Sequence, residues 1–331
     1  MGLNQKQLAG KLGVSQMTIS RVMNNRAGVS SALRERISSI ARNSGYVHDK
    51  IAMGLRGNSI RLVGLIIPDV NNSFFPQITT AIERRASEEG YQILLAHSHE
   101  SYDQENHVIN LLRGFRVDGF IIAPSGTENQ IGNYTVLQKF KIPFVFIDRY
   151  KKKIRTGAVV TDVENGSLQL GRYLIRKGYR KWGYLEGPAG VSSSNEHKRG
   201  LQRSLCEITS KGHQLVSVTA GFGEKDGFRA VQELLKKFEP DVIIGVNDPV
   251  AIGAYRYLKH KNIRVPQDIA LAGFSDLKMT ALLEVPLTTV REFTAEIGKK
   301  AFNLLLEMIR NHKPAYQTIR LKPELVVRDS A

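Results

Sequence analysis

Residues 8–24 read LAGKLGVSQMTISRVMN and decide the fold of the N-terminal part of this 331-residue chain. Leu8 and Leu12 lie one helical turn apart, which predicts a short amphipathic helix at the start of the stretch. Gly13 ends that helix, because glycine enters the left-handed backbone conformation at little steric cost. Ser15 then supplies a side-chain oxygen that can cap a second helix. Two short helices joined by a tight turn predict a helix-turn-helix.

A third apolar-periodic segment begins near residue 30, where Leu33, Ile37 and Ile40 share one face. Three such helices can bury one small core and place the second helix in the major groove of DNA. The charge agrees with this interpretation, since residues 1–60 carry nine Lys or Arg against two acids, or +7 of the +16 total. A basic N-terminal part on a nearly balanced body is typical of a protein that binds a polyanion.

The spacing within residues 8–24 resembles the N-terminal part of the lactose/galactose-repressor (LacI/GalR) family. The shared pattern is a small residue, a glycine, Val-Ser, and then Thr-hydrophobic-Ser-Arg-Val at fixed offsets. The resemblance extends over essentially the whole chain. It implies a DNA-binding transcriptional repressor that is controlled by a small-molecule effector and is not an enzyme. It also implies a homodimer that binds a pseudo-palindromic, double-stranded DNA operator.

The resemblance assigns base reading to Gln16, Met17 and Arg21. Their chemistry suits that role, because glutamine can pair with adenine, arginine with guanine, and methionine can pack on the thymine methyl group. Phosphate contacts or helix capping are expected from four further polar residues, Ser15, Thr18, Ser20 and Asn24.

Residues 47–60 are expected to form a hinge between the helix-turn-helix domain of residues 1–46 and an effector-binding core of residues 61–331. A helix this short is marginal on its own in water. The resemblance implies that it folds with its dimer mate on DNA, with Leu55 wedged into the minor groove and Ala52 beside it. The alternative is a linker leucine with no role in DNA binding.

From residue 61 onward, short apolar strands alternate with helical segments, which predicts an α/β core. The expected helices are residues 75–90, 103–115, 131–140, 163–178, 195–210, 224–238 and 248–261, and a strand is expected at residues 269–274. The first strand, LVGLIIP at residues 62–68, is wholly apolar, as expected for a parallel sheet covered on both faces. The family's core is two-lobed and periplasmic-binding-protein-like, with doubly wound parallel sheets. The expected lobes are residues 61–161 with 291–322, and residues 162–290 with 323–331.

Ligands of such sheets bind beyond the carboxyl ends of the strands. That rule and the family's motifs together select the candidate effector-binding residues, which are Asp69, Asn72, Phe74, Phe75, Asp148, Arg149, His197, Phe222, Asn247, Asp248, Ser275 and Asp276. Carboxylates and amides suit vicinal hydroxyls, and phenyl rings can sandwich the apolar face of a sugar. A carbohydrate effector is therefore predicted, although a single aspartate after a strand is more often a helix cap or turn residue.

Two departures from the family bear on the ligand. His197 stands where many relatives carry an arginine, and histidine offers fewer donors than a guanidinium. Ser275 stands where many carry an aspartate, so either Asp276 supplies the acid or none is present. Altered hydroxyl recognition is expected. The alternative for His197 is a capped or solvent-facing helix residue.

The enzyme and metal alternatives lack support. The sequence has no G-x-x-x-x-G-K-[ST] loop, no G-x-G-x-x-G after the first core strand and no G-x-S-x-G elbow, so neither an activity nor a cofactor is predicted. The single cysteine, Cys206, has no close His or Cys partner, and His97 and His99 would point to opposite faces of a strand. No metal site is therefore expected.

The chain is expected to be cytoplasmic and free of membrane contact. It has no apolar run of about 18 residues, no secretory signal pattern at its start, and a cysteine content that fits a reducing compartment. Two alternatives remain open: a sugar-binding component of transport, and a regulator whose effector is a purine or a protein.

Overall fold

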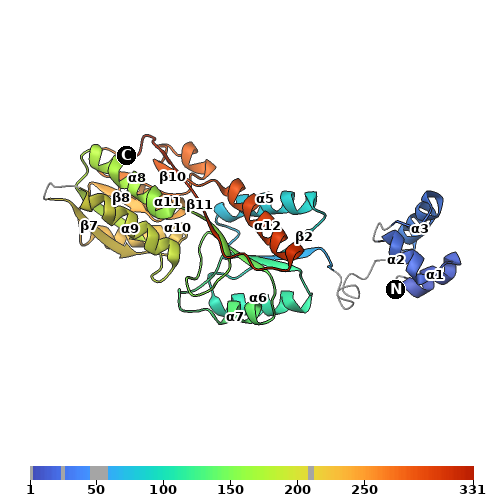
Figure 1. Ribbon diagram of the computed structural model, residues 1–331. Coiled ribbons are helices and arrows are strands. Elements are labelled where there is room, and N and C mark those ends of the chain that lie inside the picture. The colour runs from blue at the N-terminus through green and yellow to red at the C-terminus, as the bar shows by residue number, and fades with distance from the viewer. Residues whose placement is uncertain (1–2, 24–26, 45–58, 208–211) are drawn as a thin grey trace. The chain divides into compact units, whose positions relative to one another are not determined.

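The computed structural model describes residues 3–23, 27–44, 59–207 and 212–331. The chain divides into two compact units, Met1–Ile60 and Arg61–Ala331 (Figure 1). Each is treated by itself below. Within the described residues, no helix has both the length and the apolar character needed to cross a membrane.

The described residues of the N-terminal unit include the helices α1 (Gln5–Leu12), α2 (Gln16–Met23) and α3 (Ser31–Asn43). They meet in one core, in which the side chains of Leu8, Ile19 and Ile37 have no exposed surface. The predicted helices are confirmed at these positions.

The turn between α1 and α2 has the expected chemistry. Gly13 adopts the left-handed conformation with φ of 64° and ends α1. The hydroxyl of Ser15 accepts a hydrogen bond of 3.1 Å from the backbone N–H of Thr18, which caps the start of α2. The exposed start of α2 is therefore held in a fixed conformation.

The first lobe of the core is built on a six-stranded sheet with the strand order β11-β5-β4-β3-β1-β2. All of its strand pairs are parallel. Its strands are β1 (Leu62–Ile67), β2 (Gln92–His97), β3 (Gly119–Ile122), β4 (Phe144–Ile147), β5 (Gly157–Thr161) and β11 (Thr318–Leu321). Its helices are α5 (Phe74–Glu88), α6 (Tyr102–Gly114), α7 (Gly132–Lys139) and α12 (Thr294–Asn311). Figure 1 shows α5 and α12 on one face of this sheet and α6 and α7 on the other.

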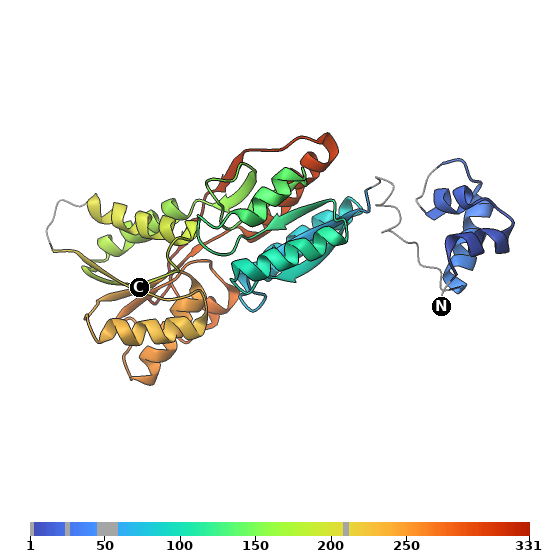
Figure 2. The same ribbon diagram turned by 90° about the horizontal axis from the view of Figure 1, so that it is seen from below.

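The second lobe has a parallel four-stranded sheet with the order β7-β6-β8-β9. Its strands are β6 (Lys181–Glu186), β7 (Gln214–Thr219), β8 (Val242–Gly245) and β9 (Ala270–Ala272). Its helices are α8 (Val163–Arg176), α9 (Ser192–Cys206), α10 (Glu224–Leu235) and α11 (Asp248–His260), followed by a short 3-10 helix, Lys278–Leu282. In Figure 2, α8 and α9 lie on one face of this sheet and α10 and α11 lie on the other.

Three segments connect the two lobes. The chain passes from β5 to α8, then from β10 (Thr289–Arg291) to α12, and finally from β11 to β12 (Glu324–Val326). Strands β10 and β12 pair in antiparallel fashion beside these connections. The predicted α/β class with doubly wound parallel sheets is confirmed.

Some expected elements differ from the observed ones. Helix α9 begins at Ser192, although the sequence favoured a start at Asn195. Strand β9 is limited to three residues, where a strand of six was expected. Helix α12 was not among the expected helices, although its buried residues recur at helical spacing. These differences matter below, because the start of α9 and the residues after β9 and β10 contribute to a pocket.

Candidate functional site

The recognition surface predicted for DNA lies on α2. Gln16 and Arg21 are exposed, and the side chain of Met17 is 66% exposed although it is apolar. Ile19 and Val22 of the same helix are buried and fasten it to the core. An amphipathic helix with this outer face can contact base edges in a major groove.

The other residues predicted to contact DNA fall into two groups. Ser15 is exposed, and Thr18 and Ser20 are half-buried on α2. The Ser15 hydroxyl lies 2.9 Å from that of Thr18, so part of its hydrogen-bonding capacity stabilises the helix start. Asn24, Ala52 and Leu55 lie outside the described residues, as do residues 47–58 of the predicted hinge.

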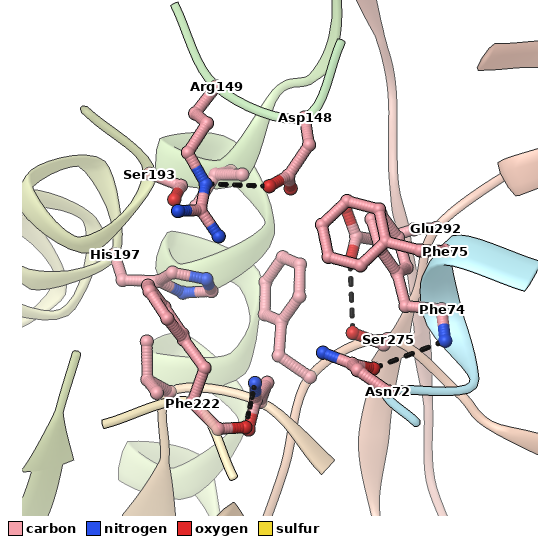
Figure 3. A pocket seen from close by; sticks show the side chains of 14 residues that line it. Asn72, Phe74, Phe75, Asp148, Arg149, Ser193, His197, Phe222, Ser275 and Glu292 are labelled. Atoms are coloured by element: carbon pink, nitrogen blue, oxygen red, sulfur yellow. Dashed lines mark hydrogen bonds and ion pairs between the residues drawn. The ribbon is translucent and has the colours of Figure 1, made fainter. Parts of the chain in front are cut away.

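The core contains a small pocket, with a cavity volume of about 40 Å³, between its two lobes (Figure 3). The lining residues come from the ends of strands and the starts of helices in both lobes. They are Asn72, Phe74, Phe75, Asp148, Arg149, Val163, Ser193, His197, Phe222, Val246, Asn247, Phe274, Ser275 and Glu292.

Arg149 is held on both sides by carboxylates. Its Nε donates to Asp148 at 2.9 Å, and its two terminal nitrogens donate to the carboxylate of Glu100 at 2.7 and 3.1 Å. Its guanidinium also lies over the ring of Phe222, 4.7 Å from the ring centre. The Arg149 side chain is only 4% exposed, so these contacts fix it as a rigid part of the pocket.

The backbone around the pocket is strained at two lining residues. Asp148 has φ of 63° and Ser275 has φ of 128°. Residues other than glycine adopt such values only at a cost in conformational energy. Asp148 follows β4 and Ser275 follows β9. The unusual backbone therefore occurs at the strand ends that carry two polar lining residues.

His197 is a buried lining residue of α9. Its Nδ1 lies 2.9 Å from the Ser167 hydroxyl, and its ring meets that of Phe274 edge to face with centres 4.3 Å apart. Burial lowers the pKa of His197 to about 3, so the ring is neutral at physiological pH. The expected alternative of a solvent-facing residue is wrong, because the His197 side chain is 7% exposed.

Glu292 brings a second carboxyl to the pocket, immediately after β10. The hydroxyl of Ser275 donates to its Oε1 at 3.0 Å. Burial raises the pKa of Glu292 to about 8, and the nearby charge of Asp148 acts in the same direction. Burial also raises the pKa of Asp148, although its partner Arg149 opposes that change.

The two lining amides use part of their hydrogen-bonding capacity within the protein. Asn247 donates to the backbone carbonyl of Phe222 at 2.9 Å and caps α11 by accepting from the N–H of Val250. Asn72 accepts from the N–H of Phe74 at 3.2 Å. The rings of Phe74 and Phe75 meet edge to face and form an apolar side of the pocket.

Nine of the twelve predicted effector-binding residues line this pocket, and three do not. Asp69 accepts hydrogen bonds from the backbone and side chain of Asn71, as a turn residue does. Asp248 is fully buried, where it accepts from the Thr289 hydroxyl and the N–H of Leu277. Asp276 pairs with two arginines, Arg291 and Arg328. Each of the three carboxylates is engaged with protein groups away from the pocket.

Five lining residues were not predicted from the sequence: Val163, Ser193, Val246, Phe274 and Glu292. Val246 directly follows β8 and Phe274 lies two residues after the end of β9, so the strand-end rule could have selected them. Among the described residues, no group of three or more His, Cys, Asp or Glu side chains is arranged to hold a metal ion.

Comparison with known families matches both units of the chain. Residues 6–49 match the model for bacterial regulatory proteins of the lacI family. Residues 61–323 match the model for periplasmic binding proteins and the sugar-binding domain of the LacI family.

Individual proteins match over nearly the whole chain. The HTH-type transcriptional repressor PurR of Vibrio atlanticus (strain LGP32) is 26% identical over 326 residues, which cover 98% of this chain and 97% of PurR. In fold, the chain is similar to the Lac repressor dimer bound to operator and the anti-inducer ONPF, with a TM-score of 0.86 and 22% sequence identity. That match covers 100% of this chain and 99% of the Lac repressor chain. The chain is also similar to the transcriptional regulator CelR in complex with cellobiose (TM-score 0.74, 24% identity, 99% and 100% covered).

These matches confirm the resemblance to the family both in the N-terminal unit and in the core. They also oppose an enzyme, since the family consists of regulatory proteins. Residues 6–49 match the regulatory family. A transport component with the same core would not need such a DNA-binding segment, so this match opposes that alternative. The chain belongs to the LacI family of bacterial regulatory proteins and is a DNA-binding transcriptional regulator.

Proposed function

We propose that this protein is a repressor whose DNA binding is controlled by a carbohydrate bound in the pocket between the lobes. Residues 1–46 bind a pseudo-palindromic operator, residues 47–60 form the hinge, and the core dimerises. Two copies are needed because one small helix-turn-helix reads only a half-site.

The observation that carries the effector class is the composition of the pocket. Phenyl rings from both lobes, Phe74, Phe75 and Phe222 among them, provide apolar surface for the face of a sugar ring. Asp148, Asn72 and Ser193 offer acceptors and donors that hydroxyl groups can use. The regulator CelR, similar in fold, is described in complex with cellobiose, which supports a carbohydrate in a core of this kind.

The pocket also provides a route from ligand to DNA. Its lining residues come from both lobes, so a ligand that contacts both favours one lobe arrangement over another. A ligand shifts that equilibrium only by its difference in affinity for the two arrangements. In a dimer, such a shift changes the spacing of the two DNA-binding units and hence operator affinity.

The first experiment is a thermal-shift screen of the full-length protein against sugars, sugar phosphates, nucleosides and purines. A ligand at a hundredfold excess over its dissociation constant adds about 2.7 kcal/mol of stability. We expect a sugar to raise the melting temperature of the wild type and of Asp103→Ala, which changes an exposed residue of α6. Asp148→Ala should abolish the shift.

Operator binding completes the test. The sugar should change the affinity of the protein for a duplex selected from a random library, and Asp148→Ala should bind that duplex without responding to the sugar. A purine hit would replace the carbohydrate with a purine effector. A silent panel, with DNA binding intact, would contradict a small-molecule effector of these classes and favour a protein effector.

A further inference from the structure

Glu292 is the lining acid that has no positively charged partner in the pocket. It follows β10 in one of the connections between the lobes, and Figure 3 shows its carboxyl joined to Ser275 by a hydrogen bond. The hydrogen bond from Ser275 is neutral and does not supply a positive charge. Within the part of the chain that the structure describes, no Lys, Arg or His forms an ion pair with Glu292.

Among the described residues that line the pocket, the only permanent cation is Arg149, and it is already paired. All three guanidinium nitrogens of Arg149 donate to carboxylates, one to Asp148 and two to Glu100. These two acids together outweigh its single charge. His197, the other basic lining residue, is neutral at physiological pH because burial lowers its pKa to about 3.

The lining therefore offers no uncommitted cation to a ligand. Arg149 is paired with Asp148 and Glu100, and an ionised Glu292 adds a negative charge that has no such partner. A phosphate or carboxylate placed in the pocket would meet these acids without an uncommitted cation to receive it. A partly buried carboxylate is stable only when a positive charge or several donors accompany it.

We propose that the effector carries a protonated nitrogen that pairs with Glu292, so that it is an amine-bearing carbohydrate of the amino-sugar class rather than a neutral or acidic sugar. The ammonium supplies the cation that the lining lacks and donates to the carboxyl of Glu292, beside the hydroxyls of Ser275 and Thr161. The hydroxyls of the same ligand use Asp148 and the amides, and its ring lies against the phenyl groups. This inference rests on the proposed carbohydrate pocket and names its ligand more closely.

The test compares three matched ligands at pH 7 on the full-length protein by calorimetric titration. The three ligands are a hexosamine, its N-acetyl derivative and the parent hexose. The comparison is made once for each of glucosamine, galactosamine and mannosamine. We expect at least one hexosamine to bind about tenfold or more tightly than its N-acetyl derivative and its parent sugar, as a charge-assisted hydrogen bond requires. The hexose 6-phosphates should bind more weakly than the parents.

Glu292→Gln keeps the size of the side chain and removes its charge. It should abolish the preference for the amine, while Glu296→Gln, at an exposed position on α12, should retain it. If Glu292→Gln fails to fold, the comparison of the three ligands on the wild type still decides the question.

The outcomes separate this inference from the proposed function. If a neutral sugar binds as tightly as its amine, or if Glu292→Gln keeps the preference, the amine assignment is overturned and the carbohydrate pocket stands. If no sugar of either panel binds, both the pocket function and this inference are overturned.

Discussion

The phenol of Tyr150 donates a hydrogen bond of 2.9 Å to Oε1 of Glu196, and the two residues belong to different lobes of the core. Tyr150 follows β4, while Glu196 lies on α9. Arg320 of β11 adds hydrogen bonds to both partners, at 2.9 Å to the phenol oxygen and at 2.9 and 3.2 Å to the carboxylate. Glu196 is buried, so this network is a well-shielded polar connection between the lobes.

Removal of the phenol oxygen should weaken that connection. We expect Tyr150→Phe to lower the free energy of unfolding of the core by about 1–2 kcal/mol, because a hydrogen bond to a charged group is lost while the ring under Arg320 remains. Chemical denaturation of the full-length protein measures this. Tyr316→Phe is the matched control, since Tyr316 is 55% exposed and also has an arginine over its ring. Equal stability of the two variants would show that the Tyr150 hydrogen bond contributes nothing.

Glu292 should make the protein less stable as the pH rises. Its pKa in the folded protein is raised to about 8 by burial and by Asp148, while in the unfolded chain it is near the ordinary value for glutamate. Between these two values the folded state holds a proton that the unfolded state has released. The stability from this group is therefore complete at low pH and is lost as the pH rises through 8.

The slope from one such group is at most about 1.4 kcal/mol per pH unit. Glu292→Gln should flatten the decline in unfolding free energy between pH 5 and 8 relative to the wild type, whereas Glu296→Gln should not. Asp148 and Asp248 also act on Glu292, so the difference between the variants is the quantity to compare. Parallel curves for wild type and Glu292→Gln would contradict a raised pKa.

His197 should act in the opposite direction. Burial lowers its pKa to about 3, so between pH 3 and about 6.5 the unfolded chain binds a proton that the folded protein excludes. The corresponding stability is complete above pH 6.5 and is lost on acidification. His197→Asn, whose amide can still bond Ser167, should be less sensitive to a shift from pH 6.5 to 4.5 than the wild type.

The control for this change is His312→Asn at an exposed position. Its backbone is left-handed, with φ of 51°, and asparagine tolerates that conformation. His312→Asn should follow the wild-type stability curve. If His197→Asn loses stability on acidification as steeply as the wild type, then His197 is not the group excluded from protonation.

The sequence predicted those lining residues that are polar and also lie at the carboxyl end of a predicted strand. Asn72, Asp148 and Asn247 could be selected because the carboxyl ends of parallel strands meet at one edge of a sheet. Ser193 could not, because α9 begins after Val191 without a side-chain cap, so no capping signal marks the start of this helix. The early start of α9 is what brings Ser193 to the pocket.

Other errors arose from partners that are distant in sequence. Asp248 and Asp276 follow strands just as Asp148 does, yet their carboxylates are engaged by Thr289 and by Arg328. No local pattern distinguishes these cases. Glu292 was missed because the strand before it, β10, has only three residues. That strand is formed by pairing with β12, which is distant in the sequence.

The base-reading assignment gives a last prediction. Arg21 is exposed on α2, and loss of a bidentate contact from arginine to guanine costs about 1–3 kcal/mol and relaxes specificity at one base position. We expect Arg21→Ala to lose this affinity and to become insensitive to the base pair at one position, as measured with operator duplexes in which each base pair is changed in turn. Arg36→Ala, at an exposed position on α3, removes the same charge and should weaken all duplexes alike without changing their ranking. If Arg21→Ala also preserves the ranking, Arg21 contacts the backbone of the DNA, and sequence reading must be assigned to Gln16 and Met17.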